Sequence, residues 1–241
     1  MLPVEAPEEA VDIVGTGGDA SGSYNISTCA SFIVAGAGVP VAKHGNRAAS
    51  SKAGAADTLE ALGLEMERAG MLAEETLNEL GICFLFAANH HPAMKRITPI
   101  RRRIGKRTIF NLMGPLANPA HVTRQLIGIA RPDYAPVYAE ALEQLGTEAA
   151  IVVSGEEGLD EVSGAGPTVA VAIGDVLLGK RIVPEDAGVR RHPIEAIRGG
   201  DPAHNGYALR RLLKGEHGAY RDAVLINAAV ALALTGETLT N

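Results

Sequence analysis

The stretch VDIVGTGGD at residues 11–19, followed by SYNIST at residues 23–28, decides how this sequence is interpreted. Val11–Val14 is an apolar run typical of a buried strand. It leads into a glycine-rich turn, and hydroxyl and amide side chains follow at the start of a helix. Glycines let backbone N–H groups approach a ligand, and a helix N-terminus favours negative charge. The stretch therefore predicts a phosphate-binding turn, although a GxGG pattern alone also occurs in ordinary tight turns.

The polar residues at this helix start allow two interpretations. Asn25, Ser27 and Thr28 can bind phosphate beside the four backbone N–H groups that lack partners there. Alternatively, Asn25 or Ser27 caps the helix. The two roles are compatible with each other.

Composition narrows the class of protein. The 241 residues suffice for one large domain, or for a domain with a small partner, and 46% of them are hydrophobic. The net charge of −6 argues against a general nucleic-acid binder, and no apolar run is long enough to span a membrane. The start of the chain is acidic, unlike a signal peptide, and Cys29 and Cys83 lie in apolar segments as expected of buried free thiols. We expect a cytoplasmic protein with no nucleic-acid and no membrane partner.

Apolar segments of strand type alternate with amphipathic helical segments. This alternation predicts an α/β fold with a largely parallel central sheet flanked by helices. Strands are expected at Val11–Val14, Pro40–Ala42, Ile82–Ala87, Gln125–Ile129 and Ala149–Val153, with a hairpin formed by Thr168–Ile173 and Val176–Leu178. Helices are expected at Asn25–Ala37, Ala53–Leu62, Met94–Ile104, Ile109–Leu116, Tyr134–Leu145, Asn205–Leu213 and Arg221–Leu234.

A second polar loop, KHGNR at residues 43–47, follows the second strand and continues to Ser50, Ser51 and Lys52. Loops after strands are the usual ligand contacts of open α/β sheets. Its basic, imidazole and hydroxyl groups suit a polyanion. The alternative, a solvated charged turn, accounts less well for the interleaved glycine, asparagine and serines.

A third segment is strongly basic. It follows Asn89-His90-His91-Pro92 and has no acidic residue, which favours capture of an anionic substrate. Adjacent histidines on an extended segment point to opposite faces, which argues against a histidine metal site. The seven basic residues are Lys95, Arg96, Arg101, Arg102, Arg103, Lys106 and Arg107.

A fourth segment, GLDE at residues 158–161, places two carboxylates in a loop. Alone, Asp160 and Glu161 are typical of a solvated turn. Beside two phosphate-binding loops they fit Mg²⁺, which takes one or two carboxylates plus phosphate oxygens and water.

GTGGD, NIST, KHGNR, HHPAM, RTIFNLMGPLANP and GLDE, in this order, resemble the anthranilate phosphoribosyltransferase family over about residues 11–234. The resemblance implies the nucleoside phosphorylase/phosphoribosyltransferase-like fold and a Mg²⁺-dependent reaction. Phosphoribosyl pyrophosphate and anthranilate would give phosphoribosyl-anthranilate and pyrophosphate, as a step of tryptophan biosynthesis. The related pyrimidine nucleoside phosphorylases share the fold but differ in these loops. A phosphorylase, or a non-catalytic fragment that binds phosphoribosyl compounds, is the alternative.

The resemblance also implies residue roles. It assigns anthranilate contacts to Gly15, Asn46, His91 and Arg101, and metal contacts to Ser27, Asp160 and Glu161. Contacts to phosphoribosyl pyrophosphate are implied for Gly15, Gly18, Asp19, Ser23, Asn25, Ile26, Ser27, Thr28, Lys43, His44, Gly45, Asn46, Arg47, Ala48, Ala49, Ser50, Ser51 and Ala55. Lys43 and Arg47 can neutralise the leaving pyrophosphate, and Arg101 can hold a carboxylate through two hydrogen bonds.

Three departures from the family pattern stand out. Ala20 replaces a frequent glycine and is acceptable if its φ is negative. Ser23-Tyr24 replaces a Thr-Phe pair, and Ala55 replaces a serine.

The family's domain organisation sets a further expectation. Residues 1–90 and 119–241 are expected to form the α/β domain that binds phosphoribosyl pyrophosphate. Residues 91–118 are expected to be the remaining helices of a small all-helical domain, which forms the family's dimer interface. This sequence lacks the rest of that domain and the C-terminal helices, which means either that it is a piece of a longer chain or that the protein is a truncated form. In a truncated form we expect apolar faces of Met94–Leu116 to lie bare.

Overall fold

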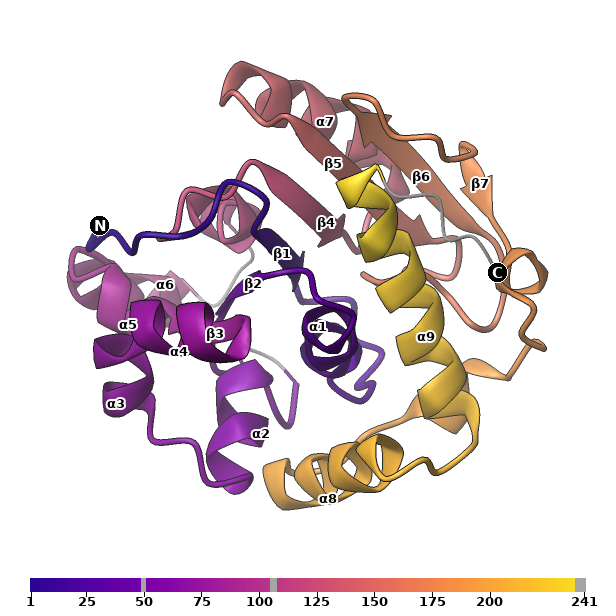
Figure 1. Ribbon diagram of the computed structural model, residues 1–241, viewed down its shortest axis with the longest axis horizontal. Helices are drawn as coiled ribbons and strands as arrows, with labels where there is room; N and C mark the ends of the chain where they lie inside the picture. Colours follow the sequence, from indigo (N-terminus) through magenta and orange to yellow (C-terminus); the bar gives the residue numbers. More distant parts are fainter. Residues whose placement is uncertain (49–50, 105–107, 237–241) are drawn as a thin grey trace.

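A seven-stranded sheet forms the centre of the computed structural model, which describes residues 1–48, 51–104 and 108–236 (Figure 1). The strand order is β3-β2-β1-β4-β5-β6-β7. The five strands from β3 to β5 run parallel, and β6 and β7 are antiparallel, so the prediction of a largely parallel sheet is confirmed. The strands span Val11–Gly15, Val41–Gly45, Ile82–Phe86, Arg124–Gly128, Ala149–Gly155, Thr168–Ile173 and Arg181–Ile182, numbered in that order.

Helices cover both faces of this sheet, as its strands require, because a parallel strand buries side chains on both sides. On one face α1 and α9 pack together against Val11 and Ile13, and on the other α7 packs against Val14 (Figure 1). The α-helices α1 to α9 are Ile26–Gly36, Ala55–Ala61, Met66–Met71, Ala73–Leu80, Ala87–His90, Met94–Ile104, Ala135–Gln144, Pro202–Leu213 and Ala219–Leu232. Short 3₁₀ turns lie at Ile109–Asn111, Pro115–Ala117, Pro132–Tyr134, Pro184–Ala187, Ile194–Ile197 and Ala233–Thr235.

The predicted hairpin is wrong in its second strand. Val176–Leu178 is irregular, and β6 pairs instead with β7, through Thr168 to Ile182 and Val169 to Arg181. Val176 and Leu178 pack against the core while Leu177 between them is exposed. This alternation of buried and exposed side chains resembles that of a strand, but residues 174–180 form a loop, and the strand that pairs with β6 begins only at Arg181.

The segment after α6 also differs from its prediction. Instead of one helix over Ile109–Leu116 it forms two separate 3₁₀ turns, because Pro115 lacks the N–H group that a continuing helix needs. The prediction also omits α3 and α4. Their apolar residues Met66, Ala69, Ala73 and Leu77 are buried, and they flank the sheet beside β3.

The order of the strands locates the candidate site. From β1 the chain first builds outward through β2 to β3, and then returns to place β4 on the other side of β1. Ligands of open α/β sheets bind at the carboxyl ends of the strands where the order reverses. In this molecule that point lies where β1 ends at Gly15 and β4 ends at Gly128.

In the residues that the structure describes, no helix is long and apolar enough to cross a lipid bilayer.

Candidate active site

Two neighbouring strands each end in a glycine at the point where the strand order reverses. Gly15 of β1 and Gly128 of β4 are register partners, and the loop that carries Asp160 crosses directly over both. A Cβ on Gly15 would lie 2.5 Å from Oδ2 of Asp160, and one on Gly128 would lie 1.7 Å from the carbonyl oxygen of Asp160. Glycine at both strand ends therefore makes room for the acidic loop.

The acidic loop faces the glycine turn and the start of α1. Oδ2 of Asp160 accepts a hydrogen bond of 2.6 Å from the backbone N–H of Gly17. Oε1 of Glu161 accepts one of 3.2 Å from the backbone N–H of Ser27, at the N-terminus of α1. Segments more than 130 residues apart in sequence thus meet around one small volume.

Crowding of negative charge perturbs these carboxyls. Burial raises the pKa of Asp160 well above its usual value, and the neighbouring Asp19 and Glu161 raise it further. Burial also raises the pKa of Glu161 to about 7, although Lys43 opposes that shift. Buried acids that repel one another are stabilised as carboxylates when a cation lies between them.

The donor set fits a hard cation that keeps other ligands. Among the residues that the structure describes, no three His, Cys, Asp or Glu side chains are spaced to hold a metal ion unaided. Mg²⁺ needs no such cage, because it is usually bound by one or two carboxylates together with water and substrate phosphates. Asp160, Glu161 and the nearby Ser27 hydroxyl offer this kind of partial site.

Lys43 lies between two acidic groups, in the middle of β2. The side chain is buried, and Nζ donates 2.5 Å to the carbonyl of Ile13 and 3.4 Å to Oγ of Ser27. Burial lowers the pKa of Lys43, while Asp12 and Glu161 both favour its charged form. The ammonium group is thus held beside the carboxylates and the helix start.

Asp12 supplies the buried counter-charge, and sequence reasoning missed it. Its oxygens accept from the backbone N–H of His44 at 3.1 Å and from Nδ2 of Asn118 at 2.8 Å. Burial raises the pKa of Asp12 to about 6, against the pull of Lys43. A charged residue inside the apolar strand VDIV was the available signal, because an unpaired carboxylate is not retained in a core.

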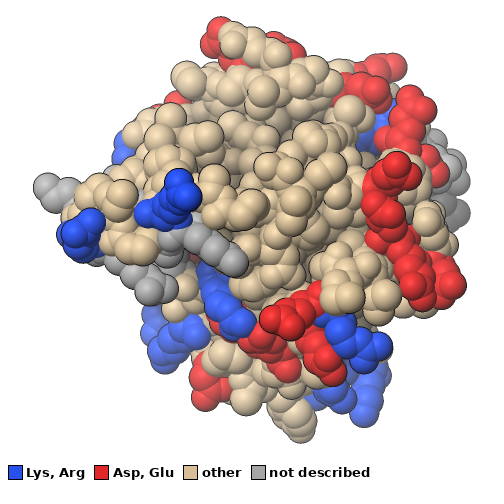
Figure 2. All heavy atoms as spheres, turned by 90° about the vertical axis from the view of Figure 1, so that its left-hand side faces the viewer, with Lys and Arg blue, Asp and Glu red and all other residues tan. Residues whose placement is uncertain are grey.

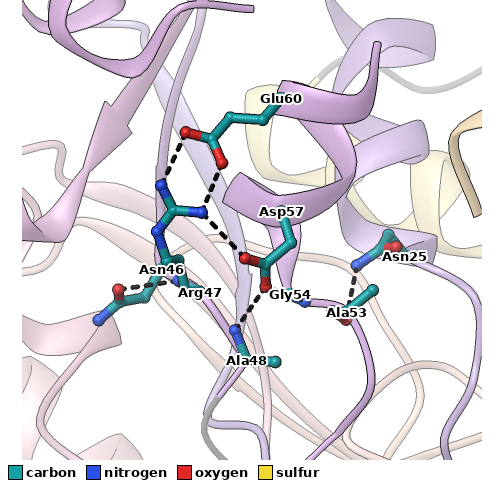
Figure 3. A network of polar contacts seen from close by, with 8 residues as sticks. All are labelled: Asn25, Asn46, Arg47, Ala48, Ala53, Gly54, Asp57 and Glu60. Atoms are coloured by element: carbon teal, nitrogen blue, oxygen red, sulfur yellow. Dashed lines mark hydrogen bonds and ion pairs between the residues drawn. The ribbon is translucent and has the colours of Figure 1, made fainter. Parts of the chain in front are cut away.

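Figure 3 shows how the second loop is closed. Oδ2 of Asp57, in the first turn of α2, accepts 2.9 Å hydrogen bonds from the backbone N–H groups of both Ala48 and Gly54. Arg47 pairs with Asp57 at 3.1 Å and with both oxygens of Glu60 at 2.5 and 2.7 Å. The Arg47 guanidinium is thus engaged within the protein, and a phosphate contact requires it to leave these acids.

His44 and His91 form a second cluster, on the other side of the strand ends. Nδ1 of His44 lies 3.1 Å from the carbonyl oxygen of Gly114, and the two imidazole rings are 5.3 Å apart. Burial, with His91 as the next cause, lowers the pKa of His44 to about 3, and burial lowers that of His91 as well. Both rings are therefore neutral near pH 7, so the His44 side chain brings no positive charge to a phosphate.

Asn25 precedes α1, yet its side chain does not cap the helix. Its Oδ1 accepts from Thr58 and Asn205, and its Nδ2 donates 3.4 Å to the carbonyl of Ala53 in the second loop. The hydroxyl of Thr28 is buried without a hydrogen-bond partner in the described part of the chain.

The remaining predicted residues divide by exposure. Ile26 is buried in the core, so only its backbone can reach a ligand. Gly18, Asn46 and Ser51 are exposed, and Ser23, Gly45 and Ala55 are half-buried near the two loops. Ala49 and Ser50 lie outside the described residues, as do Lys106 and Arg107 of the basic stretch. Arg101 lies in α6, and its side chain is not described.

Ala20 does not meet the condition of a negative φ, under which alanine would be acceptable there. Its φ is +61°, in the left-handed region where a Cβ is strained and glycine is favoured. The turn after Asp19 therefore keeps the backbone of a glycine turn with an alanine in it.

Comparison with known proteins shows which class of protein carries this fold and candidate site: an α/β glycosyl transferase. The model of the glycosyl transferase family a/b domain matches residues 7–241. The chain is 63% identical over 238 residues to anthranilate phosphoribosyltransferase of Novosphingobium aromaticivorans, covering 98% of this chain and 72% of that protein. It is 64% identical over 243 residues to the enzyme of Sphingopyxis alaskensis, covering 100% and 73%.

Solved structures agree with the sequences. Anthranilate phosphoribosyltransferase from Thermus thermophilus superimposes with a TM-score of 0.90 at 45% identity, over 99% of this chain and 71% of that one. The Saccharomyces cerevisiae enzyme in complex with PRPP and Mg gives 0.89 at 31% identity, over 98% and 67%. The chain belongs to the anthranilate phosphoribosyltransferase family.

Proposed function

We propose that this chain transfers the phosphoribosyl group of phosphoribosyl pyrophosphate to anthranilate. The bond from ribose C1 to the pyrophosphate oxygen breaks, a bond from C1 to the anthranilate nitrogen forms, and that nitrogen loses a proton. Pyrophosphate leaves with the electrons of the broken bond. The reaction needs an anion-binding loop, a cation site and a place for an aromatic acid.

One observation carries the proposal: the buried pair Asp160 and Glu161 lies against the glycine turn and the N-terminus of α1, with Lys43 beside it. The turn attracts an anion, but the acidic pair beside it repels the same anion unless a cation lies between the pair and the ligand. Metal-bridged pyrophosphate is such a ligand, whereas inorganic phosphate alone would meet two uncompensated carboxylates.

Each part of the site then has a role. Asp160, Glu161 and Ser27 would hold Mg²⁺, which supplies neutralisation of the charge that develops on the pyrophosphate. Lys43 stabilises the same charge, and the N–H groups of the glycine turn and of α1 orient the anion. No side chain of the site has to form a covalent intermediate, because positioning and electrostatic stabilisation lower the barrier.

We place anthranilate on the side of the strand ends that carries the histidines. Asn46 directly follows β2, and neutral His91 lies beside His44 there. Gly15 leaves space at the end of β1, and Arg101 is proposed to bind the anthranilate carboxylate, which a guanidinium fork matches geometrically.

A fluorescence assay tests this function. Consumption of anthranilate should require phosphoribosyl pyrophosphate and Mg²⁺ together, and omission of either should abolish it. The same protein should not cleave a pyrimidine nucleoside in the presence of inorganic phosphate. If phosphorolysis occurs and anthranilate is left unchanged, the proposal is wrong.

We further propose that the enzyme acts in the cytoplasm as a homodimer. Apolar residues are exposed on α6 and on the turn after it, with Ile100, Ile104, Ile109 and Met113 between 42% and 67% exposed. Figure 2 shows the face on this side of the molecule, where charged residues gather at the margins and the middle carries few. Such a face supports association with another helical surface. Light scattering of the purified protein measures the assembly directly.

A further inference from the structure

Asn25 has a saturated side-chain oxygen. Its Oδ1 accepts a 2.6 Å hydrogen bond from the hydroxyl of Thr58 on α2 and a 3.0 Å hydrogen bond from Nδ2 of Asn205 on α8. An amide oxygen has two acceptor sites, so both are used. The amide nitrogen is consequently turned the other way, toward the carbonyl of Ala53 in the second loop (Figure 3).

The orientation of Asn205 is itself fixed by the backbone. Its Oδ1 accepts a 2.7 Å hydrogen bond from the N–H of Gly200, a group that can only donate. The Nδ2 end must therefore face Asn25. Asn205 is only 2% exposed, so water does not compete for these contacts. Gly199 allows the close approach, because a Cβ there would lie 2.7 Å from Oδ1 of Asn205.

This relay decides which atom of Asn25 faces the two phosphate loops. The Asn25 nitrogen carries two N–H groups, and the described structure uses one of them, at 3.4 Å. In the observed orientation the side chain presents a donor to an anion. The reversed amide would present an oxygen, which repels phosphate. The relay thus selects the orientation that favours an anionic ligand.

We propose that Asn205 is a positioning residue for the phosphoribosyl pyrophosphate site, acting through Asn25. This inference rests on the proposed function, since it assumes that Asn25 faces that substrate. Asn205 itself touches no reacting atom. The contribution of Thr58 is smaller, because its hydroxyl can either donate to Oδ1 of Asn25 or accept from Nδ2, and so does not select one orientation.

The test is steady-state kinetics of the Asn205→Asp variant with Mg²⁺ and both substrates. The carboxylate is isosteric and still accepts from Gly200, but it can no longer donate to Asn25 and instead repels Oδ1. The KM for phosphoribosyl pyrophosphate should rise about tenfold or more, as expected when a buried acceptor loses its donor. The KM for anthranilate and kcat should change less than about threefold by the same reasoning.

Two further comparisons make the result specific. Asn78→Asp makes the same chemical change at an exposed position of α4 and should leave all constants unchanged. Thr58→Val removes the other donor to Asn25, whereas Thr58→Ser keeps it. The valine variant should raise the KM for phosphoribosyl pyrophosphate less than Asn205→Asp does, because Thr58 does not select the orientation, and the serine variant should keep the unmodified value. Asn205→Ala removes the donor without placing a charge in the core, so it tests the relay if Asn205→Asp fails to fold, and it should raise the same KM.

The inference is overturned if folded Asn205→Asp keeps its KM for phosphoribosyl pyrophosphate, or if both KM values and kcat worsen together. The latter pattern would indicate a general structural role. Failure of the proposed function looks different, because the unmodified protein would then consume no anthranilate at all.

Discussion

At the residue scale, the site depends on the absence of side chains at two strand ends. Gly15 and Gly128 leave the space that Asp160 and its backbone occupy. A glycine that ends an apolar strand was visible in the sequence at both positions, as VDIVG and RQLIG. Only the first was singled out, because a motif follows it, whereas the need for the second arises from β4 lying beside β1.

Gly128→Ala should displace the acidic loop. Its Cβ would lie 1.7 Å from the carbonyl oxygen of Asp160, so the loop must move away. We expect the free energy of unfolding, measured with urea, to fall by about 3 kcal/mol. Calorimetry should show weaker Mg²⁺-dependent binding of phosphoribosyl pyrophosphate. Gly164→Ala is the matched control, since the nearest atom to its Cβ is Cβ of Ala223 at 3.9 Å. Equal effects of the two substitutions would contradict this view of the strand ends.

Ala20→Gly should stabilise the protein. The positive φ of Ala20 costs an L-residue about 1 kcal/mol that glycine avoids, less the greater freedom of glycine in the unfolded chain. Urea unfolding should show a gain of up to about 1 kcal/mol. The variant Ala35→Gly, inside α1, should instead have a free energy of unfolding that is lower by about 1 kcal/mol. A loss at position 20 as well would show that the turn does not carry this strain.

At the element scale, helices remote in sequence hold the site loops. Asn227 on α9 is fully buried, and its side chain forms two hydrogen bonds with the backbone of Val162, which follows Glu161 in the sequence. Its Oδ1 accepts from the Val162 N–H, and its Nδ2 donates to the Val162 carbonyl, both at 2.9 Å. α9 also packs along α1, which carries Ser27. The two halves of the candidate metal site are thus attached to one helix.

Removal of the two hydrogen bonds between Asn227 and Val162 should lower the free energy of unfolding. Asn227→Ala leaves a buried N–H group and a buried carbonyl of Val162 without their partner, and each such loss costs about 1–3 kcal/mol. The free energy of unfolding, measured with a denaturant, should fall by about 3 kcal/mol in total. Asn78→Ala, at an exposed position of α4, should change stability by less than about 0.5 kcal/mol. A loss no larger at Asn227 than at Asn78 would exclude the proposed attachment.

The sequence predicted elements better than their contacts. Strands β1 to β5 follow from apolar runs, and the loops after β1 and β2 follow from glycine and polar residues. The positions of Asn205 and Asn227 could not be predicted, because each asparagine lies in a helix and reaches a partner 180 or 65 residues away. A polar helix residue alone more often faces solvent, and only the packing of α8 and α9 reveals these two.

At the scale of the whole molecule, the contribution of His44 to stability should be lost as the pH becomes acidic. Burial and the neighbouring His91, His90 and Lys43 lower its pKa to about 3, against the Gly114 carbonyl. In the unfolded chain an ordinary histidine takes up a proton below about pH 6.5. The unfolded state thus binds more protons between pH 6.5 and 3, and the stability present above pH 6.5 is lost as the pH falls through that range.

The difference between two proteins isolates this effect. From pH 7 to pH 5 the unfolding free energy of the unmodified protein should fall about 2 kcal/mol more than that of His44→Gln. Gln retains an amide donor for the Gly114 carbonyl. His217→Gln, at an exposed position, should follow the unmodified protein throughout. Parallel pH profiles for His44→Gln and the unmodified protein would refute the burial of a neutral ring.

The central claim is that the acidic pair and the phosphate-binding turn form one metal-dependent site. The measurement that tests it most directly is anthranilate consumption as a function of Mg²⁺ concentration, for the unmodified protein and for the double variant Asp160→Asn, Glu161→Gln. Both substitutions keep the size of the side chain and remove the charge that Mg²⁺ needs. We predict saturable activation of the unmodified protein and no metal response in the folded variant. The same Mg²⁺ response in both proteins would contradict the account.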